Sequence, residues 1–190
     1  QALRQRVMST PEISPPSRAH VASTGRTAAD LRRIIIWHDA ENCPIPQHPM
    51  DGQAGGPYDA PKLVRTVLLE ALLALTGESE PSDASRALAG RVPLEWSMVL
   101  HHDGANGWHP SDSNMDELIE EGINLIEPGR KGGAVDMKLK QLISSTVSER
   151  AVCGASNTAT LAVLITGDRD FSSNVKALTE AGFRVVILHR

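Results

Sequence analysis

The hydrophobic pattern of this chain alternates between short continuous apolar runs and longer segments with helical spacing. The first run, at 31–38, contains three consecutive isoleucines and Trp37, and it ends at Asp39. A continuous run of this length is typical of a strand that is buried on both faces of a parallel sheet. Further strands are predicted at 94–100, 123–126, 160–165 and 184–188.

Helical spacing separates these strands. In the segment 62–75, apolar residues recur every three or four positions and form one stripe. Helices are also predicted at 112–121, 135–147 and 171–181, and Gly122 and Gly182 are typical helix-stop residues. Strands that alternate with helices predict an α/β domain with a mostly parallel sheet.

The remaining segments are predicted to be irregular. Residues 1–29 carry Pro, Ser and Thr without apolar periodicity, so we expect a disordered tail or linker before a domain at 30–190. The segments 47–60 and 77–92 are read as insertions without regular structure, and 149–157 as a loop. Because the chain begins with Gln1 and stops directly after an apolar run, we expect it to be a piece of a longer protein.

Composition and charge narrow the function classes. The chain is 41% hydrophobic and 22% charged, as in ordinary globular proteins, and it has no run of eighteen apolar residues, so no membrane span is expected. The net charge of -4 is uneven, with +4 in residues 1–33 and -8 in the remainder. A basic tail is compatible with nucleic-acid contact, whereas the acidic body would repel a phosphate backbone unless metal ions neutralise part of it.

Several kinds of site are not supported by the residue spacing. Cys43 and Cys153 form no C-x-x-C pair, so we expect two free buried thiols in a reducing compartment and a cytoplasmic protein. The histidines lack the spacing of a zinc site, and no Ser-His-Asp or Cys-His arrangement is recognisable. The Gly-rich segment 128–133 is not followed by the G-K-[ST] of a phosphate-binding loop.

Four aspartates are instead placed where a metal site could form. Asp39 and Asp168 each follow a predicted strand, and parallel strands end at the same edge of a sheet. Asp170 comes two residues after Asp168, and Asp136 opens a predicted helix after two glycines. Carboxylates are the ligands that Mg²⁺ or Mn²⁺ prefers, and such ions activate water and stabilise charge on a phosphodiester.

Each of these acids also has an ordinary explanation. Asp39 alone could cap a turn, Asp168 or Asp170 could be the N-cap of a helix, and Asp136 could be a first-turn acid. A receiver-like phosphoacceptor domain also gathers acids at this edge. It would carry an acidic pair after the first strand and a lysine at the end of a late strand, whereas this late strand ends in Gly-Asp-Arg-Asp.

Three motifs in order resemble the NYN domain, a family of the PIN-like nuclease group. They are Trp-His-Asp-Ala-Glu-Asn-Cys-Pro-Ile-Pro at 37–46, Gly-Ala-Val-Asp-Met-Lys-Leu at 133–139 and Ile-Thr-Gly-Asp-Arg-Asp-Phe at 165–171. The closing segment 182–189 is similar to the end of the same fold, and the resemblance covers about 31–190. The opening D-x-E-N-C-x-x-P is most similar to the limkain-like branch, the meiosis regulator and mRNA stability type.

The resemblance implies a PIN-like three-layer fold and an endoribonuclease that depends on Mg²⁺ or Mn²⁺. It implies that Asn42 supports the first loop or touches the site, and that Thr166 bonds a ligand or substrate or caps the next turn. Phosphate contacts are expected from basic residues near the acids, although a solvated surface is an equal alternative for them. The metal-binding and catalytic residues implied are Asp39, Asp136, Asp168 and Asp170; the substrate-binding ones are Asn42, Arg130, Lys131, Lys138, Thr166 and Arg169. Lys140, which follows Lys138 on the same predicted helix, is weighed as a phosphate contact in the same way.

The expected partner is RNA, with no membrane. Single-stranded RNA is the expected substrate, because an open acidic groove offers no evident element that reads bases. Relatives often carry RNA-binding or LOTUS-type modules, so such modules are expected elsewhere in a full-length chain. The alternative is a catalytically weak NYN-fold module that binds RNA within a larger protein.

Overall fold

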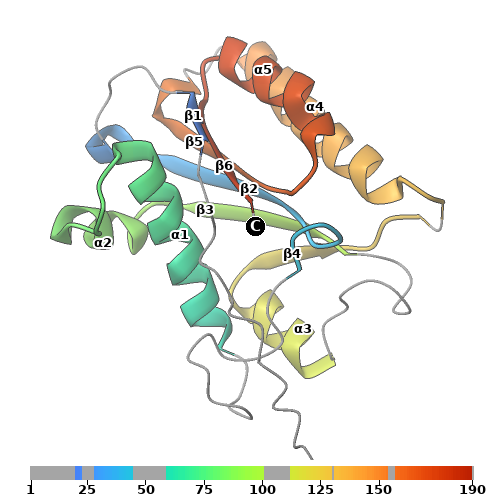
Figure 1. Ribbon diagram of the computed structural model, residues 1–190, viewed down its shortest axis with the longest axis horizontal. Helices are drawn as coiled ribbons and strands as arrows, with labels where there is room; N and C mark the ends of the chain where they lie inside the picture. Colours follow the sequence, from blue (N-terminus) through green and yellow to red (C-terminus); the bar gives the residue numbers. More distant parts are fainter. Residues whose placement is uncertain are drawn as a thin grey trace, which may run out of the picture.

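A single sheet organises the molecule. The computed structural model describes residues 20–22, 28–44, 59–100, 112–129, 131–153 and 157–189. In these residues six strands form one sheet in the order β1-β6-β5-β2-β3-β4 (Figure 1), and each neighbouring pair is parallel except β1 with β6. The five strand predictions are confirmed to within two residues at each end. The strands are β1 (His20–Ala22), β2 (Arg33–Asp39), β3 (Leu94–Val99), β4 (Ile123–Ile126), β5 (Thr160–Ile165) and β6 (Arg184–Leu188).

Helices cover both faces of the sheet, which confirms the three-layer α/β architecture. α4 and α5 lie on one face, and α1 and α3 lie on the other (Figure 1). Among the described helices, none combines the length and apolar character that a membrane span requires. The described helices are α1 (Ala60–Thr76), α2 (Asp83–Ala89), α3 (Asp112–Glu120), α4 (Ala134–Cys153) and α5 (Ser172–Glu180), with short 3-10 helices η1 (Ala28–Asp30), η2 (Asn157–Ala159) and η3 (Arg169–Phe171).

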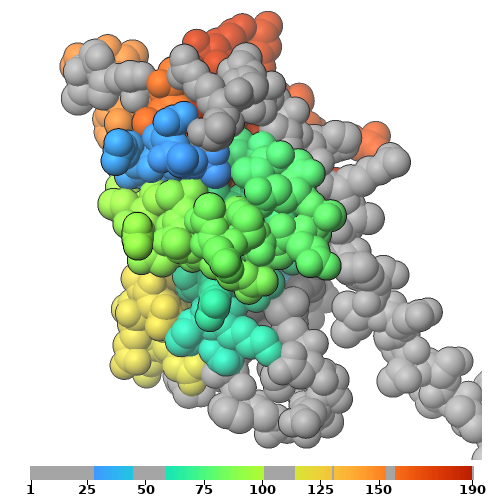
Figure 2. All heavy atoms as spheres, turned by 90° about the vertical axis from the view of Figure 1, so that its left-hand side faces the viewer, coloured from blue at the N-terminus to red at the C-terminus, as the bar shows by residue number. Residues whose placement is uncertain are grey.

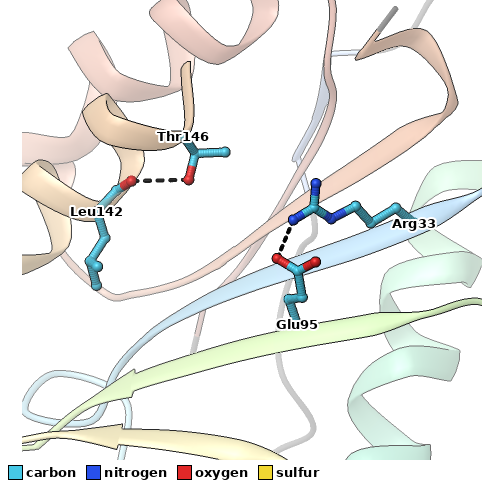
Figure 3. Close-up of polar contacts among 4 residues, drawn as sticks. All are labelled: Arg33, Glu95, Leu142 and Thr146. Carbon is cyan, nitrogen blue, oxygen red and sulfur yellow. Dashed lines mark hydrogen bonds and ion pairs between the residues drawn. The ribbon is translucent and has the colours of Figure 1, made fainter. Parts of the chain in front are cut away.

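The central strand β2 explains the continuous apolar run in the sequence. Ile34 and Ile36 pack into the core under α1, whereas Ile35 and Trp37 pack into the core under α4 and α5. Successive side chains of a strand point to opposite faces, so a strand covered on both sides must be apolar throughout. Only the two ends of β2 carry charge. Arg33 at its start donates a hydrogen bond to Glu95 of β3 (Figure 3), and Asp39 is its last residue.

The prediction that 77–92 lacks regular structure is wrong, because residues 83–89 form α2. Ser82 is the N-cap of this helix, and its hydroxyl accepts a hydrogen bond of 3.2 Å from the Ser85 N–H. Leu88 and Ala89 pack against the core under α1. A helix of about two turns is too short to show a periodic stripe in a polar sequence, and tertiary packing stabilises it instead. α2 lies in the middle of the surface in Figure 2, at the end of the sheet where β2 begins.

α4 is longer than the pattern indicated, and the loop predicted at 149–157 is therefore wrong for 149–153. The helix has 20 residues and continues to Cys153. Residues 148–153 contain good helix formers such as Glu149 and Arg150. No Gly or Pro interrupts this segment, and the next glycine is at position 154. Within the helix, Thr146 Oγ1 donates to the carbonyl oxygen of Leu142 at 3.1 Å (Figure 3). The apolar stripe ends at Val147, but the backbone hydrogen bonds of a helix do not require a stripe.

Part of the predicted tail belongs to the sheet. Residues 20–22 form β1, which pairs antiparallel with β6 and places Val21 opposite Val186. Residues 28–30 form η1 directly before the buried Leu31. A disordered tail is thus wrong for these two segments, and the reason is that β1 covers the otherwise unpaired edge of β6. Positions 1–19, 23–27 and most of 47–60 lie outside the described residues, and the domain boundary at residue 30 stays a prediction.

Candidate active site

The C-terminal ends of β2 and β5 lie side by side, and this places Asp39 next to Thr166. The strands are parallel, and His38 is in register with Ile165, the last residue of β5. Thr166 Oγ1 donates a hydrogen bond of 2.8 Å to Asp39 Oδ2, and both residues are buried. The contact joins positions 127 residues apart, so it depends on the strand order and not on local sequence.

Asp39 is 0% exposed, yet its carboxylate is well provided with hydrogen-bond donors. The Asn42 side-chain amide donates to Oδ2 at 2.8 Å, and the Asn42 backbone N–H donates to Oδ1 at 3.1 Å. Among the described residues, Oδ2 therefore accepts two hydrogen bonds and Oδ1 accepts one. Because each carboxylate oxygen has two lone pairs, these contacts leave one on Oδ1 for a cation. Asn42 thus supports the first loop and holds Asp39, and the turn-capping alternative for Asp39 is also realised.

His38 fixes the far end of the same loop. Its Nε2 lies 2.6 Å from the carbonyl oxygen of Cys43, and since a carbonyl only accepts, Nε2 carries the hydrogen. The Cys43 N–H donates to the backbone carbonyl of Asp39 at 2.9 Å, which closes the turn. The His38 ring also contacts the ring of Trp96, with centroids 5.9 Å apart. Cys43 is buried, as expected, while the side chain of Cys153 lies outside the described part.

Thr166 also orders the segment that carries the next two acids. Its Oγ1 accepts a hydrogen bond of 3.1 Å from the Asp168 N–H, so it caps this turn while it donates to Asp39. The Asp168 side chain is the N-cap of η3 and accepts from the Asp170 N–H at 2.9 Å. Asp168 is half-buried, whereas Asp170 is exposed. The alternative that Asp168 is an N-cap is therefore correct. The capping hydrogen bond uses Oδ1, so it does not prevent Oδ2 from binding a ligand.

The surroundings of Asp136 indicate that it lies near other acids of the site. It lies in the first turn of α4, the end of that helix that meets the C-terminal edge of the sheet (Figure 1). Its pKa is raised, first by burial and then by the negative charges of Asp39 and Asp168, while Lys140 acts in the opposite direction. The causes of this shift place Asp39, Asp168 and, with the smallest effect, Glu41 within electrostatic range of Asp136.

The structure brings three of the four predicted acids into electrostatic range of one another, and the metal site itself stays a prediction. These three are Asp39, Asp136 and Asp168, whereas the contact recorded for Asp170 is its backbone N–H on Asp168. In the described part of the chain, no three His, Cys, Asp or Glu side chains are close enough to share one ion as they stand. Repulsion between like charges favours this spacing, and a cation between the carboxylates would oppose it.

A comparison of the chain with known protein families finds one that matches. The model of the NYN domain covers residues 33–190. The chain belongs to the NYN domain family. No curated protein and no solved structure matches the chain. NYN domains have a PIN-like fold and are generally ribonuclease-like hydrolases, so the resemblance found in the three motifs is confirmed at the level of the family.

The basic residues expected to bind substrate are unequally placed in this NYN domain. Lys131 and Arg169 are exposed, and Lys138 is half-buried. Arg169 is the first residue of η3 and lies between Asp168 and Asp170 along the chain. Arg130 is outside the described residues.

Lys140, weighed beside Lys138 from the sequence, lies near the site. Its Nζ lies 5.2 Å from the centroid of the Phe171 ring, and its charge lowers the pKa of Asp136. The sequence did contain a signal for it, since positions 136 and 140 are four apart on a helix and therefore share one face. The contact with Phe171, which only the structure shows, distinguishes Lys140 from Lys138 on the same helix.

Proposed function

We propose that this NYN domain is a metal-dependent endoribonuclease that hydrolyses phosphodiester bonds in single-stranded RNA. The observation that carries the proposal is the hydrogen bond of 2.8 Å from Thr166 to Asp39, which joins the ends of β2 and β5 and brings Asp39 next to the segment that holds Asp168. Asp136 lies within electrostatic range of both, since its pKa is raised by burial and then by Asp39 and Asp168. Like charges brought this close are unfavourable unless a cation shares them. The opening motif at 37–46 further supports a place in the limkain-like branch of the family.

The residues fit Mg²⁺ or Mn²⁺. The donors are carboxylate oxygens, which both ions prefer, and Asp39 keeps one lone pair on Oδ1. Asp136 and Asp168 would complete the inner part of the site, and Asp170 would extend it on the exposed side. When bound, such an ion would polarise the phosphodiester and lower the pKa of the attacking water.

The protein residues would act mainly by holding the carboxylates in place. Asn42 and Thr166 fix Asp39, so the deepest ligand needs no reorganisation when substrate arrives. Thr166 also fixes the backbone at Asp168, which couples the ends of β2 and β5. A change at Thr166 would therefore disturb two ligands at once.

The test is cleavage of an end-labelled single-stranded RNA with Mg²⁺ or Mn²⁺, with and without EDTA. Asp168→Asn is the informative variant, because Asn is also a good N-cap and preserves η3 while it removes the charge. The matched control is Asp83→Asn, which makes the same substitution at the exposed start of α2, at the other end of the sheet. We expect cleavage by the wild type and the control, and none with EDTA or by Asp168→Asn. Metal-independent cleavage, or full activity of Asp168→Asn, would refute the proposal.

A second candidate is an RNA-binding module with weak catalysis. It is favoured by the burial of Asp39, since the described residues alone supply three of the four hydrogen bonds that its carboxylate can accept. A module of this kind would bind RNA but would not be stabilised by Mg²⁺ or Mn²⁺. Thermal unfolding with increasing metal separates the two, because a ligand that binds only the folded state raises the melting temperature.

A further inference from the structure

Lys140 connects α4, which carries Asp136, to η3, which carries Asp170. It lies one helical turn after Asp136 on α4, and its ammonium group lies 5.2 Å from the centre of the Phe171 ring. Phe171 is the last residue of η3, directly after Asp170, and it is 1% exposed. The ring is thus a rigid part of the core, and it gives the lysine a fixed resting place beside the acids.

This contact makes Lys140 different from its neighbours. A lysine side chain that is free in solvent loses rotamer entropy when a ligand orders it. A cation over an aromatic face is attracted to that face, so part of the ordering is already present in Lys140. Lys131 and Arg169, in contrast, are exposed. Lys140 is itself only half-buried, so its ammonium group can still meet a ligand.

The chemistry around Lys140 indicates which ligand that would be. Outside residues 1–33 the chain carries a net charge of -8, so a polyanion needs a local cation to come near the carboxylates. We propose that Lys140, held by the Phe171 ring, binds a backbone phosphate of single-stranded RNA next to the acid cluster. The inference rests on the proposed function for its substrate class, and it adds the residue that would anchor the strand at the site.

The first experiment measures RNA binding without cleavage. The parent protein is Asp168→Asn, and the probe is a short fluorescent oligouridine, titrated by anisotropy at several KCl concentrations. Adding Lys140→Ala should weaken binding by about fivefold to tenfold, as expected for one charged contact. It should also reduce the slope of log affinity against log salt by about 0.7, the value for one phosphate contact on a single strand. Lys140→Arg should retain most of the affinity, because arginine keeps the charge and also stacks on aromatic rings.

The matched control is Lys176→Ala on α5. Lys176 is exposed and is ion-paired with Glu180 at 3.7 Å within its own helix. Equal affinities and salt slopes for the Lys140→Ala and Lys176→Ala proteins would overturn the inference, as would a loss that Lys140→Arg does not restore. Melting temperatures of all variants identify a loss that comes from misfolding.

A second readout uses the enzyme with Asp168 intact. There Lys140→Ala should raise KM more than it lowers kcat, because a phosphate held equally in the ground state and the transition state contributes uniform binding. If the wild type does not cleave RNA at all, the proposed function fails, but the anisotropy comparison still decides whether Lys140 binds the backbone. If the wild type cleaves RNA and KM does not change in Lys140→Ala, the inference fails and the proposed function stands.

Discussion

The hydrogen bond from Thr166 to Asp39 should be among the most important polar contacts for the stability of this domain. Thr166→Val keeps the shape of the side chain but removes its hydroxyl. The buried Asp39 carboxylate would lose one of its three donors, and the Asp168 N–H would lose its acceptor. Since Asp39 is 0% exposed, water cannot replace the lost donor without a local rearrangement.

The expected cost follows from the burial and charge of the acceptor. A hydrogen bond to a charged group contributes about 1.5–3 kcal/mol, and the partly buried amide of Asp168 adds a smaller amount. We therefore expect the free energy of unfolding to fall by about 2–3 kcal/mol. For a domain of this size, that loss corresponds to a decrease in melting temperature of about 5–10 °C.

The assay is urea denaturation of the metal-free protein, followed by circular dichroism. Thr146→Val is the matched control, because Thr146 donates to the uncharged carbonyl of Leu142 in the middle of α4 (Figure 3). The control makes the same chemical change, and its cost should be below about 0.5 kcal/mol. If the two variants are equally stable, the network around Asp39 does not support the fold, and the argument that Asp39 is a preorganised ligand fails with it.

Three further predictions concern charge, capping and backbone geometry. Asp136→Asn should stabilise the metal-free protein at neutral pH, because the raised pKa of Asp136 means that folding disfavours its charged form. The stability advantage of the variant should shrink as the pH falls through the raised pKa of Asp136 toward 3.8, because Asp136 of the wild type then becomes protonated and neutral. A variant that is less stable than the wild type at neutral pH would contradict this prediction. Ser82→Ala should cost about 1 kcal/mol in urea denaturation by removing the N-cap of α2, and no change would argue against that cap. Gly77→Ala should cost about 1–2 kcal/mol, because the C-cap of α1 has a φ of 72°; an unchanged melting temperature would disprove that strain.

Much of the architecture could be predicted because it depends on which residues are buried, and the local pattern of apolar residues indicates this. The run from Ile34 to Trp37 predicted a doubly covered strand, and the structure buries these residues in two cores on opposite faces. The position of Asp39 and Asp168 after such strands likewise predicted a common edge. Where the local pattern was weak, the prediction failed. The short helix α2 and the added strand β1 both depend on neighbours that are distant in sequence.

The sequence by itself thus determined the fold class, the five parallel strands and the common edge at which β2 and β5 end. Hydrophobic burial is non-directional. The periodic pattern of a helix or strand therefore indicates which of its faces is buried, but not which other element packs against that face. Only the tertiary structure decided that Thr166 donates to Asp39, that Asp136 faces Asp39 and Asp168, and that Lys140 rests on Phe171. Hydrogen bonds and cation–ring contacts are short-range and directional, so they exist only once strand order and helix placement have brought distant residues together.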